Sequence, residues 1–319
     1  MLYPPSPADR PNAEDGVRSY MMFFPYRDET KELNDETRRS AEGSFLQLQD
    51  GITHYELGGD ENGEPVILIH GFSVPYFIFD PTFEFLRRVG FRALRYDLFG
   101  RGYSDRPHTQ YNLEFFLRQL ADLLQALSIK RPVNLIGLST GGPIASAFTV
   151  SHPQQVDKLV LIDPVGAKPL RFSPMINALK IPLLAEAVLS LVSNDALING
   201  ASKDFFDPAF VEYFKSNYKV QMQFKGFRRA LLSTFRSNML GSFIEVYEQL
   251  GKMAKDILLL WGRNDITVPF EHSSALCNVL PNVQFHVIEN GGHVPHYEKP
   301  DEINPILLEF LRKNDTQIS

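Results

Sequence analysis

Short apolar runs alternate with segments of helical spacing over most of the chain. The runs are continuous rather than alternating, which is typical of strands buried on both faces. They lie at 66–69, 93–96, 133–136, 159–162, 257–260 and 283–288. Apolar residues three and four positions apart lie between or beside them, at 85–89, 113–127, 144–150 and 303–311. This alternation predicts an α/β fold in which helices cover both sides of a mostly parallel sheet.

Two segments near the start depart from this pattern. The turn dipeptide Asp50-Gly51 separates alternating segments at 45–49 and 52–57, which predicts a β-hairpin. Residues 1–44 are rich in Pro, Asp, Glu and Arg and have no sustained period, so we expect an extension outside the main fold. We interpret its apolar stretch at 20–26 as an arm packed on the body, with a membrane-surface or partner contact as the alternative.

One interval interrupts the alternation of strands and helices. About ninety residues without a convincing strand separate the run ending near Asp163 from the run beginning near Ile257, far more than an ordinary connection. Apolar residues recur at helical spacing at 175–191, 205–218 and 243–250, which predicts a helical cap. The expected division is a core at 45–166 and 251–319 with a cap at 167–250.

Composition excludes several classes of function. The 319 residues are 44% hydrophobic, and a net charge of −6 with scattered Lys and Arg argues against nucleic-acid binding. The single cysteine, Cys277, permits neither an intrachain disulfide nor a Cys-rich metal site, so we expect a cytoplasmic protein. We find no secretory signal and no apolar stretch of roughly 20 residues that would span a bilayer. The oligomeric state is not specified.

A candidate nucleophile lies in Gly137-Leu138-Ser139-Thr140-Gly141. The expected strand ends at Leu138 and the next helix begins near Gly142, so Ser139 lies at a strand-to-helix turn. Gly137 and Gly141 leave room where a sharp turn presses the backbone against its neighbours. The helix N-terminus also favours developing negative charge.

A serine hydroxyl needs a base, and the base needs an acid to orient it. His293 is the expected base because Gly291-Gly292 lets the loop after the last strand bend toward the sheet edge. His296 is read as a supporting or exposed residue. Asp265 follows the strand at 257–260 and is the expected acid, with Asp163 as the alternative.

Two backbone amides are expected to bind the oxyanion. They belong to Phe72, which follows the strand at 66–69, and Thr140, which follows the nucleophile. His70 and Gly71 support this loop, and we interpret His70 as a bracing residue rather than a second base. Asp97 ends a strand too early to be the acid and is expected to stabilise a loop.

Together these motifs resemble the α/β-hydrolase superfamily over nearly all the chain after residue 45. They are His70-Gly71-Phe72, Asp97 with Gly100-Arg101-Gly102-Tyr103-Ser104-Asp105, Gly137 to Gly141, Gly262-Arg263-Asn264-Asp265 and Gly292-His293. Within it the chain is similar to monoacylglycerol-lipase-like carboxylesterases and to C–C bond hydrolases of aromatic degradation. The resemblance implies an eight-stranded sheet, a cap after the sixth strand, and neither metal nor organic cofactor. A serine, where epoxide hydrolases and haloalkane dehalogenases use aspartate, argues against both of those activities.

The leading hypothesis from sequence is hydrolysis of a small-molecule carboxylic ester through an acyl-enzyme, as in a carboxylesterase or lipase-like enzyme. Apolar cap residues favour an acyl chain or aromatic ligand, although helical spacing fits a cap core better than a pocket lining: Met175, Ile176, Leu179, Ile181, Leu183 and Leu184. The alternative is hydrolysis of the C–C bond of a vinylogous diketone, whose carboxylates call for basic cap residues: Arg171, Lys180, Lys225, Arg228 and Arg229. Cofactor-free perhydrolysis and a non-catalytic ligand receptor are further alternatives.

Overall fold

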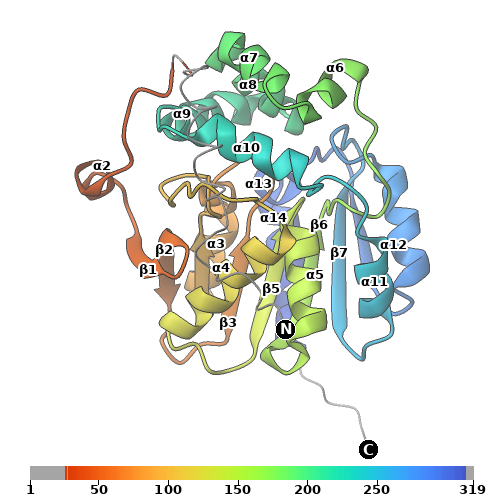
Figure 1. The fold of residues 1–319 in the computed structure, drawn as a ribbon. Helices are drawn as coiled ribbons and strands as arrows, with labels where there is room; N and C mark the ends of the chain where they lie inside the picture. Colours follow the sequence, from red (N-terminus) through yellow and green to blue (C-terminus); the bar gives the residue numbers. More distant parts are fainter. Residues whose placement is uncertain (1–25, 27, 314–319) are drawn as a thin grey trace, which may run out of the picture.

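The computed structural model describes residues 26 and 28–313. Eight strands form one sheet in the order β1-β2-β4-β3-β5-β6-β7-β8 (Figure 1). Their bounds are β1 Ser44–Leu48, β2 Gly51–Gly59, β3 Pro65–Ile69, β4 Arg92–Tyr96, β5 Val133–Leu138, β6 Val156–Ile162, β7 Asp256–Gly262 and β8 Gln284–Ile288. This is the α/β-hydrolase arrangement, as the sequence predicts.

The first two strands form the expected hairpin, with Phe45 opposite His54. β1 and β2 pair antiparallel, as do β2 and β4, and all later pairings are parallel. Parallel strands end at one edge of the sheet, so the loops after β3, β5, β6, β7 and β8 gather there. The expected nucleophile, base, both candidate acids and the two oxyanion amides lie on these loops, while Gly137 lies in β5 and Gly141 begins α5.

Helices cover both faces of the sheet because the strands are apolar on both. α3 (Asp80–Arg88), α13 (Pro295–Glu298) and α14 (Pro300–Arg312) pack on one face. α4 (Leu113–Ala126), α5 (Gly141–Ser151), α11 (Ile244–Gly251) and α12 (Ser273–Val279) pack on the other. Alternate residues of one strand join opposite cores: Ile67 packs with α4 and α5, while Leu68 packs with α3 and α14. This produces the continuous apolar runs of the sequence.

Between β6 and β7 five helices lie above the sheet (Figure 1). They are α6 Pro174–Asn177, α7 Leu184–Leu191, α8 Asn194–Ala201, α9 Val211–Met222 and α10 Phe227–Arg236. Short 3-10 turns occur here and elsewhere, at Tyr76–Phe79, Pro153–Gln155, Ala178–Lys180, Ser202–Asp204, Pro208–Phe210 and Phe270–His272. The apolar pattern did not indicate α8 and α10. We propose that these helices form the cap.

The last helix assigned to the cap from sequence lies elsewhere. α11 packs against α5 and α12, and its Tyr247 and Leu250 are buried in the core on that face of the sheet. The Tyr247 hydroxyl donates to the carbonyl of Val165, 2.7 Å away. Helical spacing shows that a helix is apolar on one side but not which body it packs on, so we place the end of the cap before α11.

The described part of the N-terminal segment contacts the cap. Both Glu29 carboxylate oxygens accept amides at the start of α10, from Gly226 at 2.6 Å and Arg228 at 2.7 Å. Lys31 forms a bridge with Phe224, and the helix α2 (Asp35–Arg39) follows. Residues 28–31 therefore pair with the α9–α10 connection. Most of the apolar stretch at 20–26 lies outside the described residues.

Candidate active site

Ser139 lies at the turn between β5 and α5, with φ of 54° in the left-handed region that L-residues rarely adopt. The Ser139 amide donates to the carbonyl of Ile162 at 3.0 Å, and its carbonyl accepts amides of Gly142 and Val165. Three hydrogen bonds thus hold the strained turn. Such a turn projects the hydroxyl at the carboxyl edge of the sheet.

Close backbone packing explains the small residues around this turn. A Cβ at Gly137 would lie 2.3 Å from the carbonyl oxygen of Gly141, and a Cβ at Gly141 would lie 2.1 Å from that of Ile69. A Cβ at Gly71 would lie 3.0 Å from the Ser139 Cβ and 3.5 Å from its Oγ. Larger residues at these positions would displace the serine or crowd its hydroxyl.

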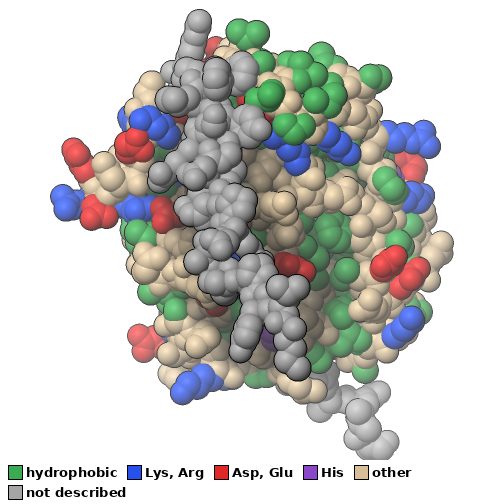
Figure 2. Space-filling model, viewed as in Figure 1, with side chains coloured by type: hydrophobic (Ala, Val, Ile, Leu, Met, Phe, Trp, Pro, Cys, Tyr) green, Lys and Arg blue, Asp and Glu red, His purple; other side chains and the backbone are tan. Residues whose placement is uncertain are grey.

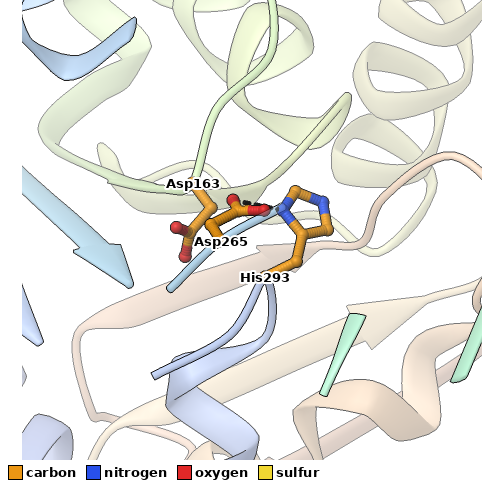
Figure 3. Close-up of side chains that lie close together, drawn as sticks. All are labelled: Asp163, Asp265 and His293. Carbon is orange, nitrogen blue, oxygen red and sulfur yellow. Dashed lines mark hydrogen bonds and ion pairs between the residues drawn. The ribbon is translucent and has the colours of Figure 1, made fainter. Parts of the chain in front are cut away.

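His293 and Asp265 form a buried pair. Nδ1 of His293 lies 2.7 Å from Oδ2 of Asp265, and the close-up in Figure 3 shows the two side chains pointing toward each other. The other carboxylate oxygen, Oδ1, accepts the amides of Thr267 and Val268, each at 2.8 Å. The carboxylate is therefore fixed on both sides. It can hold the imidazole in one orientation and leave Nε2 for proton transfer.

Asp163, the alternative acid, lies beside Asp265 (Figure 3). Its Oδ1 accepts the amide of Gly262 at 2.9 Å. Burial and the neighbouring Asp265 carboxylate raise the pKa of Asp163 well above its usual range. This shift favours the protonated form of Asp163. The geometry favours Asp265 as the acid paired with the histidine.

The environment of His293 favours its charged form. Burial alone would lower the pKa of His293, but the charge and hydrogen bond of Asp265, with the Asp204 carboxylate, raise it to about 9. Stabilisation of an imidazolium is what a general base needs once it has taken a proton.

The same three residues could in principle hold a cation. Asp163, Asp265 and His293 offer ligand atoms within 4.8 Å of one another. Both Asp265 oxygens already accept hydrogen bonds, and Nδ1 of His293 is taken by Asp265. The hydrogen-bonded acid–base pair accounts for the cluster, and the absence of a resident metal stays a prediction.

The two expected oxyanion amides have no acceptor among the residues that the structure describes. Within the described part of the chain, neither the Phe72 amide nor the Thr140 amide donates a hydrogen bond. The Phe72 loop is braced by His70, whose Nδ1 bonds the carbonyl of Gly71 at 2.8 Å and whose Nε2 accepts the amide of Leu98 at 2.9 Å. Burial lowers the pKa of His70 to about 4, so it stays neutral and cannot be a cationic acid.

The two remaining candidates have structural contacts. His296 is fully buried rather than exposed, and its Nε2 lies 3.0 Å from the carbonyl oxygen of Ile78. Asp97 pairs with His54 at 2.7 Å and accepts the amides of Tyr76 and Tyr103. Asp97 thus holds three segments together, as expected for a loop-stabilising residue.

A cap loop is joined directly to the His293 loop, which sequence reasoning missed. The His293 amide donates to the carbonyl of Asp204 at 2.7 Å, and the Asp204 carboxylate accepts the Thr267 hydroxyl at 2.6 Å. Glu298 accepts the amides of both Asp207 and Gly292, at 2.7 and 2.8 Å. Asp204 is far from His293 in sequence and gave no signal. Glu298 lies only five residues after His293, so its closeness in sequence was a signal that could have identified it.

The nucleophile and base are enclosed, with Ser139 5% and His293 4% exposed. Two surface cavities lie beside Asp265 rather than over Ser139. The larger, of about 710 Å³, is lined from 168–172 and 266–272, and the smaller, of about 390 Å³, includes Asp265 itself. The side chains of Ser139 and His293 are thus largely shielded from solvent in this structure.

Comparisons with known proteins agree with this geometry. The family model of the alpha/beta hydrolase fold matches residues 64–300. The 2-hydroxy-6-oxo-6-phenylhexa-2,4-dienoate hydrolase of Comamonas testosteroni is 28% identical over 291 residues, covering 87% of this chain and 97% of that protein.

Two solved structures are similar over most of the chain. One is a mutant of the meta-cleavage product hydrolase from Pseudomonas fluorescens IP01, with 25% identity, a TM-score of 0.71, and coverage of 85% and 98% of the two chains. The enol-lactonase from Burkholderia xenovorans LB400 has 18% identity, a TM-score of 0.71, and coverage of 85% and 100%, and so shows the fold alone. The match of the family model over most of the length shows that this chain belongs to the alpha/beta hydrolase fold family.

Proposed function

We propose that the protein is a serine hydrolase that cleaves the C–C bond of a vinylogous diketone acid. The observation that carries the hydrolase assignment is the left-handed Ser139 beside two unpaired amides, on the same sheet edge as the Asp265–His293 pair. The substrate class rests on the relatives, whose names describe hydrolases of 2-hydroxy-6-oxo-dienoates. This reverses the order of the two sequence hypotheses, in which ester hydrolysis led.

In the proposed mechanism His293 takes the proton of Ser139 as the hydroxyl attacks the ketone carbon. The Phe72 and Thr140 amides donate to the resulting oxyanion, and Asp265 stabilises the imidazolium. When the carbonyl re-forms, the C–C bond breaks, and its electron pair is delocalised into the conjugated keto acid. His293 then protonates that carbon fragment. Water, activated by His293, hydrolyses the acyl-serine to the second acid.

Ester hydrolysis remains the second candidate because of the contacts of the basic cap residues. Arg228 donates to the carbonyl of Val192 at 2.7 Å and to the side chain of Asn194 at 2.8 Å. Arg229 donates to the carbonyls of residues 106 and 107, and Lys225 pairs with Glu32. Lys180 lies over the Phe235 ring. Of the five basic cap residues named from the sequence, Arg171 alone has no such partner among residues 26 and 28–313. A neutral ester needs no cation.

The test compares two substrates on one preparation. A 6-oxo-dienoate ring-fission acid, followed by loss of its conjugated absorbance, and nitrophenyl esters of increasing acyl length are given to wild type and to Ser139→Ala. We expect kcat/KM to be higher for the ring-fission acid. We expect Ser139→Ala to reduce it by about 10⁴-fold or more.

The other possible results of this experiment would each support a different alternative. Preference for the esters by orders of magnitude would select the second candidate. Turnover of neither class would contradict the hydrolase proposal and favour a ligand receptor, and full activity in Ser139→Ala would contradict the site. A cytoplasmic location and the lack of a cofactor stay predictions.

A further inference from the structure

The apolar cap residues singled out from the sequence are neither cap core nor part of the two cavities described above. Ten large hydrophobic side chains are exposed in the described part of the chain, and seven of them lie between positions 175 and 191. They are Met175 (77% exposed), Ile176, Ile181, Leu183, Leu184, Val188 and Leu191 (83%). Figure 2 shows hydrophobic side chains gathered along the top of the molecule, over α6 and α7. We call these seven residues the cap patch.

α7 presents its apolar face to solvent, whereas a surface helix ordinarily turns its apolar face toward the core. Leu184, Val188 and Leu191 are spaced i, i+4 and i+7, so they share one helix face, and that face is exposed. An apolar stripe of this kind normally packs on a core. The side facing the protein is held instead by polar groups of α10.

Two arginines of α10 fasten this segment. Arg236 binds both Glu186 oxygens, at 2.6 and 3.0 Å, and the carbonyl of Ile181 at 3.1 Å. Arg228 binds the carbonyls of Leu189 and Val192. The apolar face is thus held outward by specific hydrogen bonds, and the exposure is a built feature of the fold.

The segment 168–191, which carries the patch, has a net charge opposite in sign to that of the whole chain. From 168 to 191 the exposed basic residues are Lys168, Arg171 and Lys180. The only acidic residue in this range, Glu186, is paired with Arg236. The full chain has a net charge of −6. A cationic rim around an apolar face matches an anionic bilayer surface.

No single described helix is long and apolar enough to cross a membrane. Pro174–Lys180 and Leu184–Leu191 reach that hydropathy only together, and they are bent by 120°. A bent pair that is apolar on its outer side suits contact within the headgroup region rather than a span.

We propose that the cap patch docks the protein on anionic phospholipid membranes, with α6 and α7 lying in the interface. The cavity lined from 168–172 and 266–272 includes residues that directly precede the cap patch and residues that directly follow Asp265 in the sequence. Docking therefore places that opening near the bilayer, where apolar substrates concentrate. The inference does not depend on which bond the enzyme cleaves.

The test is flotation of the full chain with vesicles of phosphatidylcholine alone or mixed with phosphatidylglycerol. We expect wild type to float with the mixed vesicles and to detach as salt screens the cationic rim. Met175→Ser/Leu191→Ser should weaken binding by about 10-fold or more, because the most exposed apolar side chains are lost. Arg171→Glu/Lys180→Glu should abolish the preference for phosphatidylglycerol.

Tyr213→Ser is the matched control, because Tyr213 is 54% exposed on α9 outside the cap patch. It should float like wild type. Failure of wild type to float, or equal flotation of Met175→Ser/Leu191→Ser, would overturn the proposal. So would a dimer that this double variant dissociates without any vesicle binding, since the patch would then join two copies. Hydrolysis of a water-soluble substrate is measured in parallel, so loss of activity and loss of docking are separate results.

Discussion

At the scale of single residues, the candidate site depends on the different surroundings of two neighbouring carboxyl groups, those of Asp265 and Asp163. Asp265 is fixed by two amides and paired with His293, whereas Asp163 accepts one amide and has a raised pKa. The sequence placed both acids at strand ends and favoured Asp265. It could not show that they are adjacent, because their strands are about ninety residues apart and become neighbours only in the sheet.

Asp265→Asn should change the pH dependence of hydrolysis. The base must be neutral, so kcat/KM of wild type should rise with pH through the His293 pKa, raised to about 9. Removing the carboxylate charge removes the main cause of the raised pKa, so the ascending limb should move to lower pH. The plateau should fall by about 10⁴-fold because the imidazole loses its orientation. The measurement is kcat/KM over roughly pH 5 to 10.

Asp163→Asn is the matched variant for this experiment. Asparagine keeps an oxygen for the Gly262 amide and resembles a protonated carboxyl group, so activity and pH profile should stay close to wild type. If Asp163→Asn instead lost activity as Asp265→Asn is expected to, Asp163 would be the functional acid.

At the scale of elements, short apolar strands and amphipathic helices of the core were predictable, but the packing partner of a helix was not. α11 has the same spacing as a cap helix and yet packs on α5. α8 and α10 were not indicated, and α10 carries the two arginines that fasten α7. Their partners are side chains and carbonyls remote in sequence, which periodicity does not reveal.

The hydrogen bonds of Glu298, which join the cap loop to the His293 loop, can be tested by mutation. Glu298→Ala leaves the amides of Asp207 and Gly292 without their acceptor, and the buried Gly292 donor, left unpaired, costs about 1–3 kcal/mol. We expect lower stability toward denaturant and a lower kcat, because the His293 loop is less firmly held. Urea unfolding and steady-state kinetics measure both.

Glu302→Ala on α14 is the control, since Glu302 is exposed. It should leave stability and kcat unchanged. A Glu298→Ala protein with the stability and kcat of wild type would show that the two loops are held without this carboxylate.

At the scale of the whole molecule, the sheet, its helices and the sheet edge that carries the site follow from the order of strands and helices in the sequence. The placement of Ser139, Asp265 and His293 at one sheet edge was predictable because each follows a strand, and parallel strands end at one edge. Their catalytic roles stay a prediction. The exposed cap patch was not, because exposure depends on which side of α7 the arginines of α10 hold. Helical spacing alone had favoured a buried cap core.

The central claim is that Ser139 is the nucleophile activated by His293, and covalent labelling tests it most directly. A fluorophosphonate, which phosphorylates activated serines, is added to wild type, and the intact mass and labelled peptide are determined by mass spectrometry. We predict one adduct per chain, on Ser139, absent in Ser139→Ala and formed far more slowly in His293→Ala. Labelling at another residue, or an equal rate in His293→Ala, would contradict the account.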